Sequence, residues 1–203
     1  MKICNVVRVM SVLVTFNICG SLPVIPLETE RLYLRPVELA DAPALAEVAL
    51  NPDVLKLTGL FPPLTTLEDV QGFVKSFLVG DAAQNISPRY PKSWSIVEKQ
   101  SGTVIGLVVF VAYLERHQRA EIAYAIAPAY WNHGYATEAC QVVARHAFSC
   151  GLLRLYGMVD PENKTSERVL QKLNMQCEGL MRSYMIVRGQ RVDRKMYAVV
   201  ASY

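Results

Sequence analysis

The sequence predicts one globular domain of the α/β (α+β) class, and three observations lead to this prediction. The chain has 203 residues, of which 52% are hydrophobic, so it can bury one sizeable core. From about Pro26 onward, segments with the two-residue hydrophobic period of strands alternate with segments of helical period. No internal repeat or low-complexity segment interrupts this alternation.

Strands are expected wherever apolar and polar residues alternate between turn residues. These segments are residues 27–36, 94–97, 104–111, 119–127, 153–159, 180–187 and 191–200. Helices are expected where apolar residues recur every three or four positions. These segments are residues 41–49, 66–77, 135–150 and 164–173. Short turns join the second strand to the third and the sixth to the seventh, so each of those pairs is predicted to be a hairpin.

Local residues explain where several elements begin and end. Pro128 has no N–H for a strand ladder, so it ends the strand before it. Asp41 is expected to cap or open the first helix, and Thr66 with Asp69 has the spacing of a capping box for the second. Asn174 is expected to take the left-handed conformation that ends the last helix.

Residues 1–25 stand apart from this pattern, so the domain is predicted to span residues 26–203. A basic start precedes an apolar run that ends at Cys19, as in a signal peptide. The run is too short to span a membrane, and the cleavage pattern of small residues is missing. Three interpretations stay open: an export signal, an extension, and a start placed too far upstream, with Met10 used instead.

Charge and cysteine content argue against several kinds of site. A net charge of +3 at pH 7 suits an anionic ligand, but no dense basic patch interleaved with aromatic residues predicts a nucleic-acid site. The five cysteines form no CxxC pair, and no His, Cys and Asp cluster has metal-ligand spacing. We therefore expect a cytoplasmic protein with no metal and with neither nucleic acid nor membrane as a partner.

A strand, a tight turn and a helix start at residues 119–138 predict an anion site. The first N–H groups of a helix have no partner within it, and the helix dipole favours negative charge there. Gly134 and Ala136 are small enough to let a phosphate approach the backbone closely. The alternative is a plain joint between a strand and a helix. The expected loop consists of Trp131, Asn132, His133, Gly134, Tyr135 and Ala136.

Three blocks of the chain resemble the GNAT N-acetyltransferases, and they follow one another in the order of that family. The loop at 131–136 resembles the coenzyme A pyrophosphate loop, Gln/Arg-x-x-Gly-x-Gly/Ala, with Trp131 in place of Gln or Arg. Residues 29–36 and 51–54 resemble the start of the RimJ/RimL branch, whose members acetylate N-termini of ribosomal proteins. Residues 163–173 resemble the second signature of the family.

The resemblance implies the GNAT fold, a mixed and mostly antiparallel twisted sheet of six to seven strands flanked by about four helices. It also implies acetyl-CoA as cosubstrate and direct transfer to a primary amine, either a protein N-terminus or a small amine such as a polyamine, amino acid or antibiotic. A non-catalytic acyl-CoA-binding module is the alternative, and the protein is expected to be a monomer or homodimer. The acceptor pocket is expected from residues 55–61, the loop at 80–93 and the final hairpin.

The same resemblance assigns roles along the strand that precedes the loop. The backbone amides of Ile126 and Ala127 would hold the pantetheine arm of the cofactor and its thioester carbonyl. Glu121 is the candidate general base, and its alternative is a surface ion pair with Arg116 or Arg119. His133 would help to neutralise the pyrophosphate, or would be a solvated turn residue.

Asn163 would orient the cofactor or a catalytic water, cap the helix that follows it, or do both. Ser166 would donate a proton to the departing thiolate, or would lie solvated in the first helical turn. Tyr156 and Tyr184 are alternative candidates for this proton donor, or are aromatic residues that pack in the core. Cys140 lies inside a helix and is expected to pack in the core. Trp131 would either wall the site or pack on the strand below.

Overall fold

The structure is a computed structural model, and it describes residues 24–79 and 92–201. The expected N-terminal extension therefore lies almost entirely outside the described residues, as does most of the loop at 80–93. Within the described residues, no helix combines the length and apolar character needed to cross a membrane. In the same part of the chain, no group of three or more His, Cys, Asp or Glu side chains is arranged to hold a metal ion.

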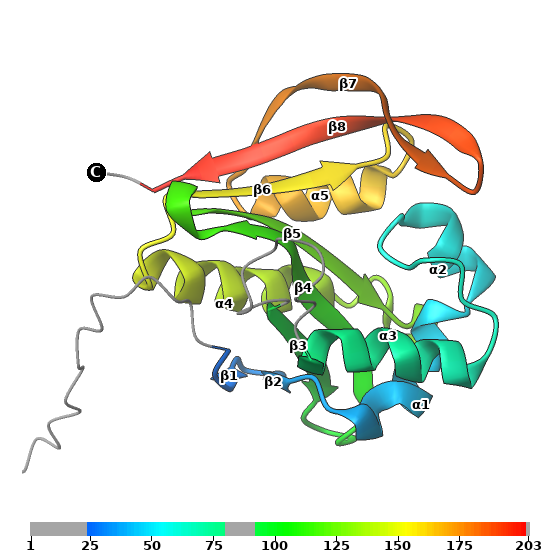
Figure 1. The fold of residues 1–203 in the computed structure, drawn as a ribbon. Coiled ribbons are helices and arrows are strands. Elements are labelled where there is room, and N and C mark those ends of the chain that lie inside the picture. The colour runs from blue at the N-terminus through cyan, green and yellow to red at the C-terminus, as the bar shows by residue number, and fades with distance from the viewer. Residues whose placement is uncertain (1–23, 80–91, 202–203) are drawn as a thin grey trace, which may run out of the picture.

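One eight-stranded sheet organises the domain, in the order β1-β2-β3-β4-β5-β6-β8-β7 (Figure 1). All neighbouring strands are antiparallel except β5 and β6, so the sheet is mixed and mostly antiparallel, as expected. The strands are β1 (Leu27–Glu28), β2 (Leu32–Pro36), β3 (Lys92–Glu98), β4 (Val104–Leu114), β5 (Arg119–Ile126), β6 (Arg154–Val159), β7 (Gln176–Val187) and β8 (Gln190–Val200).

The described helices number five, and three short 3-10 helices lie in the connections between elements. They are η1 (Leu39–Asp41), α1 (Ala42–Ala49), α2 (Pro52–Leu57), α3 (Leu67–Val79), η2 (Glu115–His117), η3 (Pro128–Tyr130), α4 (Tyr135–Ser149) and α5 (Lys164–Lys172). No helix was expected from the sequence at the position of α2. Asn51 starts this helix by accepting hydrogen bonds from the N–H groups of Asp53 and Val54, and Pro52 stands at the first helical position.

The segment expected as one strand at 27–36 is two strands, β1 and β2, which pair with each other. Its middle turns because the Thr29 N–H donates to Leu32 O (3.0 Å), and the Leu32 N–H donates to the Thr29 hydroxyl (2.9 Å). This turn explains why the sheet has eight strands and not six or seven.

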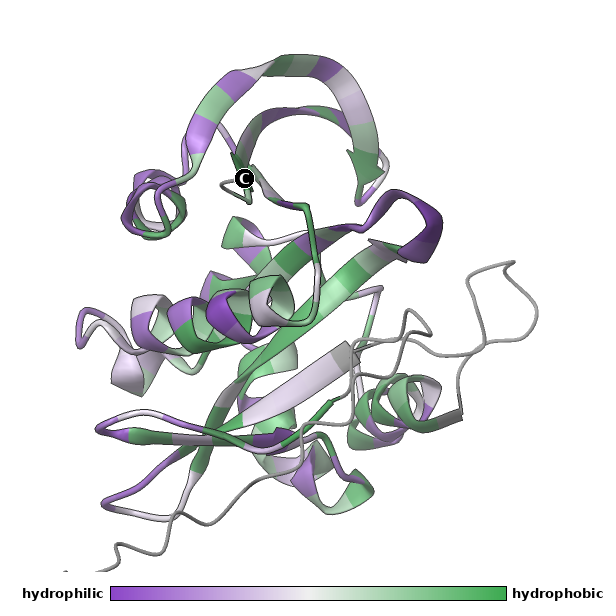
Figure 2. Ribbon diagram, turned by 90° about the vertical axis from the view of Figure 1, so that its left-hand side faces the viewer, coloured by the Kyte–Doolittle hydropathy of each residue, from purple (hydrophilic) through white to green (hydrophobic). Residues whose placement is uncertain are grey.

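Helices cover both faces of the sheet, and each face has its own core. Leu107 and Val108 are adjacent on β4, yet Leu107 packs with α1 and α3 while Val108 packs in the cluster that contains α4 and α5. Both faces of the central strands are therefore buried, which explains the long apolar run of β4. Figure 2 shows the central strands as mostly hydrophobic, whereas the β7–β8 hairpin mixes both kinds of residue.

Asp41 opens α1 from its N-cap position, as expected, but its side chain forms no capping hydrogen bond with that helix. Its carboxylate is 3% exposed and accepts hydrogen bonds from Arg35 (2.5 and 2.8 Å) and from the Ser95 hydroxyl (2.6 Å). Burial alone would raise the pKa of Asp41, but these hydrogen bonds outweigh it and leave the pKa below its ordinary value. Asp41 therefore joins α1 to the sheet through charged hydrogen bonds.

The other local predictions agree with the structure. The Thr66 hydroxyl accepts from Asp69 N (3.1 Å) while the Asp69 carboxylate accepts from Thr66 N (2.9 Å), which is the expected capping box. Asn174 has a φ of 60°, in the left-handed region. Cys140 is fully buried in α4, and burial raises the pKa of its thiol.

Candidate active site

The site begins where two neighbouring strands of the sheet separate. β5 and β6 run parallel and pair through three residues only, the last pair being Glu121 with Tyr156. Beyond that pair, β5 continues along β4 while β6 continues along β8. The two strands therefore diverge into a wedge, and one backbone edge of β5 faces this wedge.

Backbone alternation decides which groups of β5 line that edge. The Ala127 N–H donates to Ile105 O of β4 (2.8 Å), and Ala127 O accepts from Tyr130 N (2.9 Å). Since backbone direction alternates along a strand, the N–H groups of Tyr124 and Ile126 point into the wedge. The expectation that the Ala127 amide holds the cofactor arm is thereby corrected, because its N–H is already used in the sheet.

A cavity of about 650 Å³ occupies the wedge. Its lining runs from the loop before α4, past the diverging part of β5, to the end of α2 and to β8. The predicted site residues that line it are Ile126, Trp131, Asn132, His133, Gly134, Tyr135, Ala136, Asn163 and Ser166. Of the described candidates, Glu121, Ala127, Tyr156 and Tyr184 do not line it.

One end of the cavity is the N-terminus of α4. Gly134 is the residue before the helix and has a φ of 81°, a left-handed conformation that glycine adopts without a steric penalty. The N–H groups of Tyr135, Ala136 and Thr137 in the first turn have no acceptor within the helix. Because all three residues line the cavity, this end has the backbone donors and the dipole of an anion site.

Trp131 lines the cavity and also fixes the loop to β5. Its indole Nε1 donates to Ile126 O (2.7 Å), so the two alternatives for this residue hold together. His133 Nδ1 lies 2.7 Å from Trp131 O, and its ring stacks on that of Tyr135 with centroids 5.8 Å apart. These contacts fix the shape of the loop around its glycine.

Glu138, one turn into α4, fastens this loop to the turn between β1 and β2. Its carboxylate accepts from Arg31 Nη2 (2.6 Å), Arg31 Nε (2.8 Å) and the Thr29 hydroxyl (2.5 Å). Arg31 also donates from Nη1 to His133 O (2.9 Å) and lies 4.6 Å from the ring centroid of Tyr135. These bonds give a physical reason for the Thr-Glu-Arg-Leu block at the start of the domain.

α5 supplies the opposite wall of the wedge. Asn163 caps this helix, since its Oδ1 accepts from Ser166 N (3.0 Å), while its Nδ2 donates to Leu57 O of α2 (3.0 Å). The Ser166 hydroxyl lies 2.7 Å from the Tyr124 hydroxyl on β5. Burial raises the pKa of Tyr124, so this residue keeps its proton at neutral pH.

Tyr124 and two cations of α5 were not predicted from the sequence as site residues. The period of β5 assigned Tyr124 to one face of a strand, but no sequence signal showed which residue it meets across the wedge. Arg168 and Lys172 are exposed and line the cavity. Their spacing of four residues, which places them on one side of a helix, was the available signal.

Glu121 stands at the apex of the wedge, one residue before the lined part of β5. The alternative ion pair with Arg116 or Arg119 does not form; the half-buried carboxyl hydrogen-bonds with Tyr156 instead. Burial raises the pKa of Glu121 above its ordinary value, although the hydrogen bond with Tyr156 opposes this shift. Burial likewise raises the pKa of Tyr156 to about 12, so this tyrosine is protonated at neutral pH.

The other end of the cavity lies between α2 and the β7–β8 hairpin, which face each other in Figure 1. Leu57, Thr58 and Gly59 line it, together with Arg194 of β8. Arg188 in the hairpin turn donates from Nη2 to Leu55 O (2.7 Å) and so holds the hairpin against α2. The expected acceptor segments at 55–61 and in the last hairpin therefore meet here.

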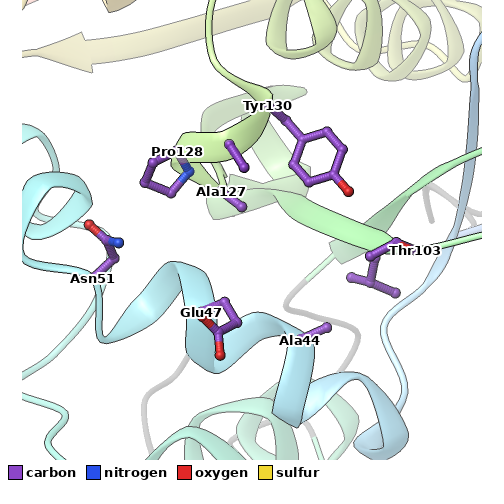
Figure 3. A pocket seen from close by; sticks show the side chains of 9 residues that line it. Ala44, Glu47, Asn51, Thr103, Ala127, Pro128 and Tyr130 are labelled. Carbon is purple, nitrogen blue, oxygen red and sulfur yellow. The ribbon is translucent and has the colours of Figure 1, made fainter. Parts of the chain in front are cut away.

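A second, smaller cavity of about 330 Å³ lies between α1 and η3 (Figure 3). Glu47, Asn51, Thr103 and Tyr130 contribute its polar groups. Ala127 is the one predicted site residue in its lining. The larger cavity is therefore the candidate active site.

Comparisons with known proteins agree with this geometry. The acetyltransferase (GNAT) domain family matches residues 31–176. The uncharacterized N-acetyltransferase YoaA of Bacillus subtilis (strain 168) is 33% identical over 175 residues, which cover 86% of this chain and 96% of YoaA. The spermidine N(1)-acetyltransferase of Escherichia coli (strain K12) is 33% identical over 90 residues, which are 44% of this chain and 48% of that protein.

A solved structure adds to the evidence for the fold. RimL, a ribosomal L7/L12 alpha-N-protein acetyltransferase in complex with coenzyme A, aligns with a TM-score of 0.74. The alignment covers 88% of this chain and 97% of the RimL chain, at 20% sequence identity. With the family matched over most of the domain and YoaA related over nearly its whole length, the chain belongs to the GNAT family of N-acetyltransferases.

Proposed function

We propose that this domain transfers an acetyl group from acetyl-CoA directly to a primary amine. The observation that carries the proposal is the continuity of the wedge from the open edge of β5 to the N-terminus of α4. An elongated cofactor with an amide arm and a pyrophosphate suits these two features. The arm would pair with the backbone of Tyr124 and Ile126, and the phosphates would accept hydrogen bonds from the first turn of α4.

The charge of the lining supports the same cofactor. Arg168 and Lys172 lie on the α5 wall and would neutralise phosphate groups. His133 lies beside the first turn of α4, and because its Nδ1 donates to Trp131 O, an imidazolium there would donate from Nε2 to a phosphate. Coenzyme A is the ligand named with the RimL structure, whose fold this chain shares.

Glu121 is proposed as the general base. An amine acceptor carries a proton at neutral pH and must lose it before its nitrogen can attack the thioester carbonyl. A carboxyl whose pKa is raised by burial is a better proton acceptor than an exposed one. Glu121 would take this proton directly or through water, from a position at the apex of the wedge.

Ser166 is proposed as the donor to the leaving group. The amine nitrogen forms a bond to the carbonyl carbon and gives its second proton to water, the C–S bond then breaks, and its electron pair stays on the coenzyme A sulfur. The Ser166 hydroxyl would donate a proton to that thiolate and would be reprotonated from the Tyr124 hydroxyl at 2.7 Å, which would regain its proton from water in the cavity. Asn163 would position Ser166 by holding the first turn of α5.

The test combines cofactor binding with turnover. Coenzyme A should raise the melting temperature of the wild type, and acetyl-CoA should release free thiol when amines are added. Gly134→Glu should abolish the thermal shift, because it fills the phosphate site and adds a negative charge. Gly102→Glu is the matched control, since Gly102 is also left-handed (φ 69°) but lies in the β3–β4 turn.

Two outcomes would contradict the proposal. A thermal shift by coenzyme A no larger than that by the same concentration of sulfate would remove the cofactor assignment. Clear binding of coenzyme A without thiol release for a peptide N-terminus, an amino acid or a polyamine would remove the enzymatic one.

A further inference from the structure

Arg194 is a buried arginine in the wall of the candidate active site. The residue is 6% exposed and lines the cavity at the end formed by α2. Arg194 lies one position beyond the last pair of β6 with β8, which joins Val159 to Lys195. Buried polar groups are normally hydrogen-bonded, since a donor removed from water without a partner destabilises the fold. The N–H groups of Arg194 therefore need partners.

Only one of the two terminal nitrogens of Arg194 donates hydrogen bonds to other described residues. Nη1 donates to Asp160 Oδ2 (2.9 Å) and to Asp193 O (3.0 Å). Within the described residues, 24–79 and 92–201, no oxygen accepts a hydrogen bond from Nη2 or Nε of Arg194. Asp160 thus balances the charge of the guanidinium but leaves donors on its other edge.

Space lies in front of that other edge because residue 59 is a glycine. A Cβ added to Gly59 would lie 3.6 Å from Arg194 Nη2 and 3.4 Å from Met185 Cε. Without a side chain at Gly59, which also lines the cavity, a ligand atom can approach Nη2 from the α2 side. The hairpin contact of Arg188 with Leu55 O holds α2 in this place.

Arg194 also shares a face of the sheet with the proposed base. Partners in register point to the same face, and residues two apart along a strand do so as well. Glu121 pairs with Tyr156, and Met158 pairs with Met196, which lies two residues after Arg194. Arg194 is thus on the face of Glu121, about four residues or 13 Å farther along β6.

The charges of the lining distinguish between acceptor classes. Among the described lining residues, Asp160 is the sole carboxylate, and Arg194 already pairs with it. A polyamine carries several positive charges and would need carboxylates at this end of the cavity. A peptide carries its α-amine beside carbonyl oxygens, which are the partners that Arg194 lacks.

We propose that Arg194 binds a carbonyl or carboxylate oxygen of the acceptor, so that the acceptor is a peptide-like α-amine and not a polyamine. This inference rests on the proposed function and deepens it by naming the class of acceptor. With the amine at the thioester near Glu121, Nη2 would donate to an oxygen within the first two residues of the acceptor.

The test measures kcat and KM with three acceptors: a short peptide with a free N-terminus, an alkylamine of similar length, and spermidine. The wild type should prefer the peptide. Arg194→Met with Asp160→Asn removes the donors without leaving a buried charge unpaired. This variant should raise the peptide KM about tenfold to a hundredfold, the range for a hydrogen bond to a charged group, and leave the alkylamine KM unchanged.

Two further variants make the result specific. Gly59→Val fills the space before Nη2 without a change of charge, and it should raise the peptide KM in the same direction. Arg154→Met with Glu178→Gln removes another ion pair of the sheet, outside the cavity lining, and should leave all three KM values unchanged. The thermal shift by coenzyme A should persist in every variant, which shows that each is folded.

Preference of the wild type for spermidine would overturn the inference while the proposed function stands. An unchanged peptide KM in the folded Arg194 and Gly59 variants would overturn it as well. Binding of coenzyme A without acetylation of any acceptor would contradict the proposed function, and the inference with it.

Discussion

Replacing Glu121 by glutamine tests the chemistry at the apex of the wedge. The substitution keeps the volume of the side chain and an oxygen that can accept from Tyr156, but the amide cannot take a proton from the acceptor. The fold and the cofactor site should be unaffected, since Glu121 lies outside the cavity lining and forms no ion pair with a described residue.

The expected loss is set by what a general base contributes. Proton transfer by a positioned group is worth about 10² to 10⁴ in rate, or about 3–5 kcal/mol of activation free energy. Because water or the substrate itself can take over part of this role, we expect turnover to fall at least about tenfold at neutral pH. The affinity for coenzyme A should change little.

The pH profile separates a base from a positioning residue. Initial rates of thiol release would be recorded for both proteins from about pH 6 to about pH 10, toward the pKa of an alkyl amine. The deficit of Glu121→Gln should shrink as pH rises, because the acceptor then arrives deprotonated. A deficit that is equal at every pH would refute the role as base, and unchanged turnover would remove Glu121 from the mechanism. Glu178→Gln serves as a control for the loss of a carboxylate elsewhere on the sheet.

Two further predictions use the pKa shifts. Tyr156→Phe removes the hydrogen bond that opposes the raised pKa of Glu121, so the acidic limb of the pH–rate profile should move to higher pH; an unmoved limb would contradict the pairing. Asp41→Asn should lower the free energy of unfolding by about 3 kcal/mol in denaturant titrations at neutral pH, because it leaves the charge of Arg35 without its buried partner. The pKa of Asp41 is lower in the folded than in the unfolded protein, so this contribution is present above the ordinary value of 3.8 and is lost as pH falls through the folded pKa. The difference between the two proteins should therefore narrow in acid, and a constant difference would contradict the assignment.

The sequence by itself determined most of the secondary structure and the class of the domain. Residues with strong local effects set those boundaries: Gly134 before α4, the Thr66 and Asp69 capping box, and Asn174 after α5. Their conformations depend on neighbours within four residues, so a single sequence is enough to read them. The turn before α4 was predictable for the same reason, because a helix N-terminus is a local structure.

Local preference failed where a distant contact decided the outcome. The segment at 27–36 reads as one strand, but Thr29 and Arg31 bind Glu138 more than 100 residues away, and the chain turns there. Asp41 reads as a helix cap, yet Arg35 and Ser95 hold its carboxylate in the interior. In both segments, hydrogen bonds form with partners that sequence spacing does not reveal.

The site itself depends most on tertiary structure. Pairing of β5 with β6 ends after Glu121, and this divergence creates the cavity, frees the Tyr124 backbone and leaves Ala127 bound to β4. The Tyr124–Ser166 contact and the position of Arg194 at the α2 end follow from how β5, α5 and β8 meet across that wedge. The sequence determines which side chains are available, but the separation of two strands decides which of them share one cavity, because that separation depends on packing between residues far apart in the chain.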